Sequence, residues 1–360
     1  MSQEYRITAA QLKDRGKDSV LLDVRDEMSF QYGHINDAIN LPLEQLKEQL
    51  QQNKKFEQFD QEKQIIVYCK KGEASAEAVE LLRKAGVNAY DLTGGYNAWL
   101  LSCMEEADSV EAKEKEKERL KEIEQSIRKK FHKQLFTKFA KAINEYDLLQ
   151  ENDKVAVCIS GGKDSMLMAK LFQELKRHNK FPFELIFLVM DPGYNEENRK
   201  VIENNARILD ILITIFETNI FDAVYEIEKS PCYLCARMRR GYLYSKAKEL
   251  GCNKIALGHH YDDVIESILM GMLYGAQVQT MMPKLHSSNF EGMELIRPMY
   301  LIREDDIKHW RDYNDLHFIQ CACRFTDTCT TCRSDGSSDS KRMEVKRLIR
   351  ELKNLHHFLP

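Results

Sequence analysis

Short apolar runs alternate with amphipathic stretches in the first hundred residues. Strand-like runs occupy residues 20–24, 64–69 and 88–93, and helical periodicity covers 75–86 and 95–102. Strands that alternate with helices favour a parallel sheet with helices packed on it. The first hundred residues are therefore predicted to form a small α/β domain.

The same alternation resumes after residue 150. Strands are expected at 154–160, 183–191, 211–218 and 254–260, and helices at 165–175, 198–209, 235–251 and 262–275. Ligands of open parallel sheets bind at the carboxyl ends of the strands. Three of these ends carry polar or glycine-rich segments, namely Ser160-Gly161-Gly162, Asp191-Pro192-Gly193 and Gly258-His259-His260. We expect them to form one pocket.

Acids and bases alternate between the two modules without Gly or Pro, over residues 105–131. This pattern predicts a solvated helix supported by i,i+4 ion pairs. We therefore expect three parts: a domain over residues 1–104, a charged helical linker over 105–131, and a second domain over 132–360.

The composition of the chain argues against a membrane protein and against a protein held together by disulfides. The chain has 360 residues, 43% of them apolar, and the sequence contains no apolar stretch long enough for a membrane span and no amino-terminal apolar signal. We expect a soluble, cytoplasmic protein without membrane partners. Ten cysteines in such a protein favour metal or thiol chemistry over disulfides. The net charge of −4 means that any contact with nucleic acid depends on local basic stretches, such as 237–241 and 340–350. The second of these equally fits an ordinary amphipathic helix.

The stretch "VAVCISGGKDS" (155–165) predicts a strand, a glycine turn and a helix start. Such a turn directs backbone N–H groups and the positive end of the helix dipole at one point, where an anion can bind. The spacing differs from that of the nucleotide-hydrolase loop, which has four residues between its first Gly and a Gly-Lys-[Ser/Thr]. Asp262 and Asp263, at the start of a later helix, could either cap that helix or hold magnesium and orient an acceptor.

Cys69 ends an apolar strand and is followed by a turn, two lysines and a helix. Loop N–H groups, a helix amino terminus and adjacent cations all stabilise a thiolate, and they would hold a persulfide anion in the same way. A lone cysteine at a strand end would otherwise be interpreted as structural.

Three segments overturn that default: "LLDVRDEMSFQYGHINDAINLPL" (21–43), "IIVYCKKGEAS" (65–75) and "DLTGGYNAWL" (91–100). In this order and spacing they resemble a single-domain rhodanese. The resemblance implies that Cys69 carries a sulfane sulfur. Many members that use thiosulfate have an Arg where this chain has Ala74, so a protein persulfide, for example on a cysteine desulfurase, is the expected sulfur source.

The second module resembles the PP-loop ATP pyrophosphatases through "SGGKDS" (160–165), and the tRNA 2-thiocytidine synthetase family through the stretches 232–275, "MMPKL" and "LIRPMYLIREDDI". The resemblance implies an adenine nucleotide alpha hydrolase-like sheet that binds ATP and leaves the α-phosphorus open to a nucleobase carbonyl oxygen. The implied ATP-binding residues are Ser160, Gly161, Gly162, Lys163, Asp164, Ser165, Asp191, Gly258 and His259. Lys163 and Asp263 would be catalytic, with Lys163 offsetting charge on pyrophosphate, and Mg²⁺ would bind Asp164 or Asp262.

The same family implies a [4Fe-4S] cluster. Cys232 and Cys235 lie one helical turn apart, and Cys321 falls where the family has its third cysteine. Three ligands would leave one iron open for hydrosulfide. This chain also has Cys323, Cys329 and Cys332, so residues 321–332 could instead form a four-thiolate zinc site. Cys158 and Cys252 lie in apolar contexts and are expected in the core.

Together the modules predict an ATP-dependent sulfurtransferase. Sulfur would pass from Cys69 to the cluster site and replace an activated oxygen, first of all at C2 of cytidine in tRNA. The alternatives are a uridine or small-molecule acceptor, an amide-forming or lysidine-forming pyrophosphatase, and a non-catalytic redox or metal sensor. A homodimer is compatible with the sequence.

Overall fold

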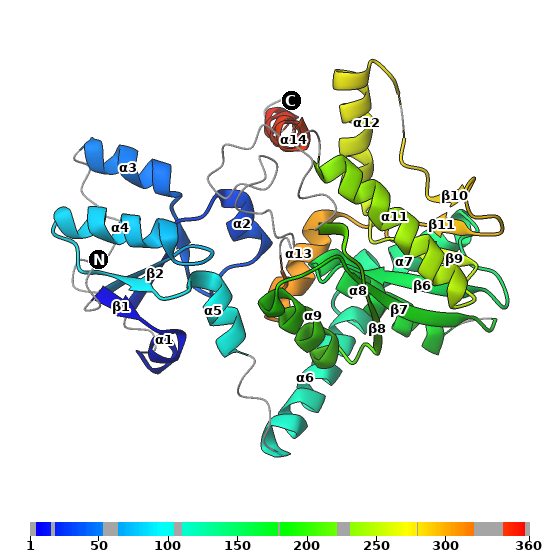
Figure 1. Ribbon diagram of the computed structural model, residues 1–360, viewed down its shortest axis with the longest axis horizontal. Helices are drawn as coiled ribbons and strands as arrows, with labels where there is room; N and C mark the ends of the chain where they lie inside the picture. The colour runs from blue at the N-terminus through cyan, green and yellow to red at the C-terminus, as the bar shows by residue number, and fades with distance from the viewer. Residues whose placement is uncertain are drawn as a thin grey trace. The chain divides into compact units, whose positions relative to one another are not determined.

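The computed structural model describes residues 5–15, 19–52, 64–103, 110–178, 181–221, 231–278, 280–319 and 341–356. These residues divide into two compact units, one up to Lys113 and one from Glu114 onward (Figure 1). Within this described part, no helix combines the length and the apolar character needed to cross a membrane.

The first unit is built on five parallel strands in the order β1-β5-β4-β2-β3. Its strands are β1 (Arg6–Ile7), β2 (Ser19–Asp23), β3 (Ile39–Asn40), β4 (Gln64–Tyr68) and β5 (Ala89–Leu92). Its helices are α1 (Ala9–Arg15), α2 (Glu27–Tyr32), α3 (Leu43–Gln51), α4 (Glu73–Lys84) and α5 (Gly95–Ser102).

Alternating residues of β4 supply two separate cores. Ile65 and Val67 pack with residues of α3 and α4, whereas Ile66 and Tyr68 pack with residues of α1 and α5. Successive side chains of a strand point to opposite faces, so helices cover both sides of the sheet (Figure 1). The central strand β4 thereby holds its carboxyl end, and Cys69 after it, in a fixed place.

The second unit has six strands in the order β10-β11-β9-β6-β7-β8. They are β6 (Lys154–Ile159), β7 (Glu184–Asp191), β8 (Ile213–Glu217), β9 (Lys254–Ala256), β10 (Lys284–His286) and β11 (Glu294–Ile296). Its helices are α6 (Val110–Arg128), α7 (Thr137–Glu145), α8 (Lys163–Arg177), α9 (Glu196–Ile208), α11 (Pro231–Glu249), α12 (Tyr261–Gly275), α13 (Glu304–Tyr313) and α14 (Lys341–His356), with a short π-helix at His132–Phe136.

All pairings in this sheet are parallel except that of the edge strand β10 with β11. Val155, Ala156 and Val157 of β6 are fully buried, as expected for a central strand covered on both faces. Cys158 and Cys252 belong to the core between this sheet and α11, which confirms the sequence interpretation. The α/β class predicted for both units is also confirmed.

Helix α6 departs from the expectation of a solvated linker. Ile123 and Ile127 are buried, and Glu124 binds the ammonium of Lys170 on α8 at 3.0 Å. The apolar positions 123 and 127 are spaced i,i+4, so they form a stripe on one side of the helix. The alternating charges of this segment predict a solvated helix because the two apolar positions are few among them. The carboxyl-terminal half of α6 nevertheless packs against the second unit.

Candidate functional site

The turn between β6 and α8 has the geometry of an anion-binding loop. Gly161 has φ +83°, and a Cβ on it would lie 2.5 Å from Cγ1 of Ile202, so only glycine fits. No side chain caps α8 at Gly162, which leaves its first N–H groups for a ligand.

Two serines hold this loop in shape. The Ser160 N–H donates to Oγ of Ser165 at 3.1 Å, and that hydroxyl donates to the carbonyl oxygen of Gly162 at 3.0 Å. The two serines predicted to line the loop therefore contact each other across it, and their hydrogen bonds close the turn.

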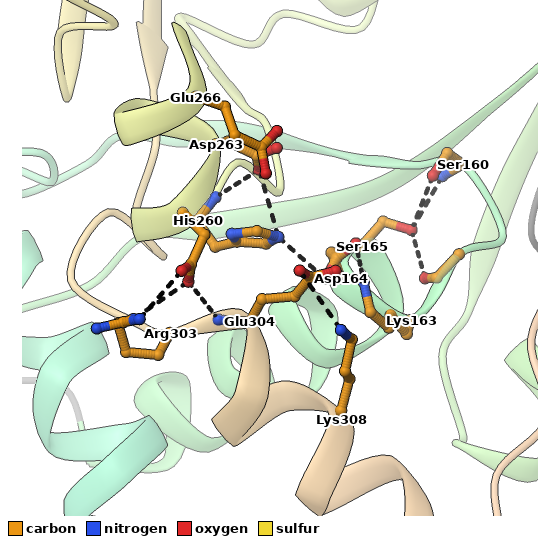
Figure 2. A network of polar contacts seen from close by, with 12 residues as sticks. Ser160, Lys163, Asp164, Ser165, His260, Asp263, Glu266, Arg303, Glu304 and Lys308 are labelled. Atoms are coloured by element: carbon orange, nitrogen blue, oxygen red, sulfur yellow. Dashed lines mark hydrogen bonds and ion pairs between the residues drawn. The ribbon is translucent and has the colours of Figure 1, made fainter. Parts of the chain in front are cut away.

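Lys163 is the charged centre of the site (Figure 2). Its side chain is 2% exposed, and its ammonium lies 3.0 Å from Asp164 and 3.3 Å from Glu304 at the start of α13. Burial raises the pKa of Glu304, but Lys163 and two further lysines bring it well below its ordinary value. A buried cation is thus neutralised by two carboxylates.

The end of β9 meets the loop directly. A Cβ on Gly258 would lie 3.3 Å from the Ser165 nitrogen, so this glycine permits the close approach. The buried imidazole of His260 has its Nε2 3.5 Å from Asp263 and 3.8 Å from Asp164. Two of the three predicted strand ends are therefore brought together.

Asp262 and Asp263, in the first turn of α12, both make contacts that hold neighbouring segments in place. The Asp262 carboxylate accepts from the Glu304 N–H at 2.7 Å and lies 3.2 Å from Arg303, so it caps α13. Asp263 accepts from the His260 N–H at 3.0 Å and also contacts Arg342 of α14. Burial raises the pKa of Asp263, but the charges of His260 and Arg342 bring it below its ordinary value. These contacts favour the capping interpretation, and both predicted ligand or catalytic roles stay predictions.

Asp191, the third predicted strand end, has structural contacts of its own. Its carboxylate accepts from the N–H groups of Gly193 and Tyr194 at 2.8 and 2.7 Å, and lies 3.3 Å from Arg199. It therefore shapes the turn after β7. Its predicted contact with ATP stays a prediction.

The structure describes one of the three predicted cluster cysteines at side-chain level. Cys235 is half-buried on α11 and packs against Met190 and Ile220. Cys232 lies one turn earlier on the same helix, while Cys321, with Cys323, Cys329 and Cys332, falls outside the described residues. Within the described part of the chain, no group of three metal-binding side chains is assembled.

Cys69 of the first unit lies in a cradle of hydrogen-bond donors. The Gly72 N–H donates to its Sγ at 3.1 Å, and Ser75 Oγ lies 3.4 Å from the same sulfur. The Ser75 hydroxyl also binds Asp91 at 2.7 Å, which fixes its position. Gly72 has φ +102°, a conformation that suits glycine and lets the loop bend around the sulfur.

A cavity of about 370 Å³ opens beside Cys69. The charged residues that line this cavity are four acids, two lysines and one arginine: Asp26, Glu27, Glu44, Glu73, Lys70, Lys71 and Arg25. Arg25 is engaged by Asp23, whose carboxylate it binds through Nε at 2.9 Å. The acidic residues thus outnumber the lysines, and Ala74 stands where an arginine would draw in a dianion.

A glycine loop between a central strand and an uncapped helix defines a nucleotide-binding unit, carried on one chain with a unit built around an amide-cradled thiol. Residues 8–102 match the family described as rhodanese-like domain, and residues 130–324, more than half of the chain, match the family described as PP-loop domain. The loop described above is the ATP-binding element of the second match.

Curated relatives point to one group. The chain is 36% identical over 215 residues to a tRNA-cytidine(32) 2-sulfurtransferase of Syntrophotalea carbinolica, a match that covers 59% of this chain and 79% of that protein. The corresponding protein of Citrifermentans bemidjiense is 35% identical over 216 residues, covering 59% and 80%. The chain belongs to the PP-loop family, in the group of ATP-dependent tRNA 2-sulfurtransferases.

Among solved structures, the U34-tRNA thiolase NcsA from Methanococcus maripaludis, described with its [4Fe-4S] cluster, is similar in fold. The match has a TM-score of 0.50 and 24% identity, and it covers 63% of this chain and 74% of that one. This likeness supports the fold of the second unit.

The sequence interpretation missed several residues of the site. Arg303 and Glu304 belong to a stretch that carries the family resemblance, and Arg342 belongs to the basic stretch 340–350, but the sequence does not predict their ion pairs in the site. The partners in these ion pairs lie 41 or more positions apart in the chain, so no local pattern marks the pairing. The acidic start of α13, "EDD", was the one available signal of a charged helix terminus near a cationic partner.

Proposed function

We propose that the chain thiolates C2 of cytidine 32 in tRNA, with sulfur supplied through Cys69. The match to the tRNA-cytidine(32) 2-sulfurtransferases, together with the intact loop geometry, carries this proposal. In the first step the C2 carbonyl oxygen attacks the α-phosphorus of ATP and pyrophosphate leaves. In the second step hydrosulfide attacks C2 and AMP leaves with the original oxygen; two thiols release this hydrosulfide from the Cys69 persulfide and are themselves oxidised to a disulfide.

The loop would hold the pyrophosphate end of ATP on the N–H groups at the start of α8. Asp164 and Glu304 neutralise the charge of Lys163 through ion pairs of 3.0 and 3.3 Å. Asp164 carries the carboxylate best placed to receive Mg²⁺, since Asp262 already caps α13. Mg²⁺ at Asp164 would free the Lys163 ammonium to face the departing pyrophosphate.

The half-buried position of Cys235 on α11, with Cys232 one turn away, fits two ligands of one metal site. Cys232, Cys235 and Cys321 would hold a [4Fe-4S] cluster, which when bound supplies an iron with an open position for the sulfur donor. Iron analysis of anaerobically prepared protein tests this: about four irons per chain are expected. Changing Cys329 or Cys332 to Ser should leave them in place, and loss of iron in these variants would assign the third ligand to that pair.

The loop around Cys69 supports its role as persulfide carrier, because the Gly72 N–H, which donates to Sγ, would stabilise a sulfur anion there. Its acidic cavity fits a protein persulfide, for example that of a cysteine desulfurase, better than thiosulfate.

Deletion of the gene, followed by nucleoside analysis of bulk tRNA, tests the whole assignment. One thiolated cytidine should disappear, and it should return with the wild-type chain but not with Asp164→Asn. An unchanged set of thiolated nucleosides would overturn the tRNA assignment.

A further inference from the structure

Arg297 is a buried cation outside the loop site. It follows β11 directly and is 8% exposed. Its Nη1 donates to the carbonyl oxygen of Met282, but its Nε is buried without a partner. Among the described residues Arg297 makes no ion pair, so its positive charge and its Nε–H donor have no partner there. Nε is one of the donors that arginine uses for bidentate binding of carboxylate or phosphate.

The surroundings of Arg297 add no negative charge at neutral pH. The groups that act on it are Tyr244 and Arg240 of α11 and Tyr300, and burial lowers its pKa. Arg240 is exposed and lies one helical turn before Tyr244 on α11. A buried guanidinium that has no carboxylate partner among the described residues is costly unless an anion joins it. Arg297 is therefore a candidate anion-binding group, with Arg240 as a second cation that acts on it.

The strand register places Arg297 at the same edge of the sheet as the PP-loop. Ile296 of β11 pairs with Ala256 of β9, and β9 lies between β11 and β6. Two strand spacings separate Arg297 from the end of β6, about 10 Å. Burial lowers the pKa of His259, which follows β9, and the charge of Arg297 lowers it further; the Nδ1 of His259 is likewise buried without a hydrogen-bond partner.

We propose that Arg297, with Arg240 as a second cation, binds a phosphodiester of the RNA acceptor and so positions the target base beside the PP-loop. The proposal rests on the function proposed above, since it takes tRNA as the acceptor. The ATP phosphates have their own donors at the loop, two strands away. A polynucleotide whose base enters beside the loop brings its own phosphates to the neighbouring strand ends. Arg297 is thus a positioning residue for the acceptor.

The test compares Arg297→Met with the wild-type chain. Removing an unpaired buried charge should leave the fold intact, so ATP should bind both with equal affinity. The affinity for tRNA transcript should fall about 10- to 100-fold, and the slope of log K against log salt should fall by about one. Arg240→Met should also lower the affinity for tRNA and reduce the salt slope. Lys176→Met, which removes one exposed charge at the far end of α8, is the matched control and should leave the affinity nearly unchanged.

Inorganic phosphate provides a probe that does not depend on the acceptor. Phosphate should raise the melting temperature of the wild-type chain and have a smaller effect on Arg297→Met. If the wild type binds no tRNA but keeps this difference, the proposed function fails while the anion site stands. Equal tRNA affinity and equal salt slope in wild type and Arg297→Met would overturn the positioning role, as would a loss of ATP affinity alone.

Discussion

At the scale of single residues, two ion pairs hold Lys163 at the centre of the loop site. Its ammonium is buried between Asp164 and Glu304, and each partner comes from a different segment of the chain. Removing one partner of such a pair leaves a buried charge uncompensated. The residue that the sequence marks as catalytic is therefore also a determinant of stability.

Glu304→Gln should lower the free energy of unfolding at pH 7 by about 3 kcal/mol, the cost of breaking a partly buried ion pair. The pKa of Glu304 lies well below its ordinary value of 4.5 in the folded chain. Its contribution is therefore present above about pH 4.5 and is lost as the pH falls below that value. Denaturant unfolding between pH 3 and 7 measures this, and the variant should lose less stability on acidification. Asp305→Asn, an exposed neighbour in the same turn, is the control.

Ala74→Arg should convert the cavity at Cys69 into a better thiosulfate site. A charge-assisted contact to the dianion is worth about 1.5–3 kcal/mol, so kcat/KM for thiosulfate should rise about 10- to 100-fold. Ala74→Gln, which adds length without charge, should change it little. If both variants behave alike, the missing arginine is not what limits thiosulfate use.

At the scale of elements, α6 carries a charge network that fixes it to α8. Glu124 binds Lys170 at 3.0 Å and Arg177 at 2.9 Å, while Arg128 binds Glu174 at 2.8 Å. Lys170 is buried, and burial lowers its pKa despite Glu124. The helix is therefore held by pairs that the alternating charges of its sequence do not distinguish from solvated ones.

Glu124→Gln should destabilise the second unit by about 3 kcal/mol, because it leaves the buried Lys170 with a carbonyl oxygen as its remaining described partner. Glu122→Gln, on an exposed position of the same helix, should change stability by less than about 0.5 kcal/mol. Thermal unfolding of both variants measures the difference. Equal stability would mean that the helix is held by its apolar stripe alone.

The long elements were predictable because each repeats a pattern over several residues. The strands β4, β6 and β7 and the helices α4, α8 and α12 lie within a few residues of the expected ranges. The two- and three-residue strands β1, β3, β10 and β11 were missed, because a periodicity needs more residues to be visible. Their pairing with neighbouring strands, rather than their own sequence, makes them strands.

At the scale of the whole molecule, the rhodanese-like unit with Cys69 and the unit with the PP-loop are separate compact units of one chain. Cys69→Ser should reduce thiolation from a protein persulfide at least about 10-fold, because thiolate nucleophilicity is lost. Thiolation from free sulfide should be unchanged, because sulfide does not need the carrier. Cys103→Ser, an exposed cysteine of the same unit, is the control. Equal loss with both sulfur sources would mean that Cys69 acts otherwise than as a carrier.

The sequence by itself determined the two α/β units, the glycine loop with its strand and helix, and the thiol at the end of β4. These features are local: a buried strand, a positive φ and a helix start are encoded within a dozen residues. Tertiary structure alone decided which charges meet. Glu304 reaches Lys163, Asp262 caps α13, and Arg297 is buried without a carboxylate, because strand order and helix packing bring together residues far apart in the chain.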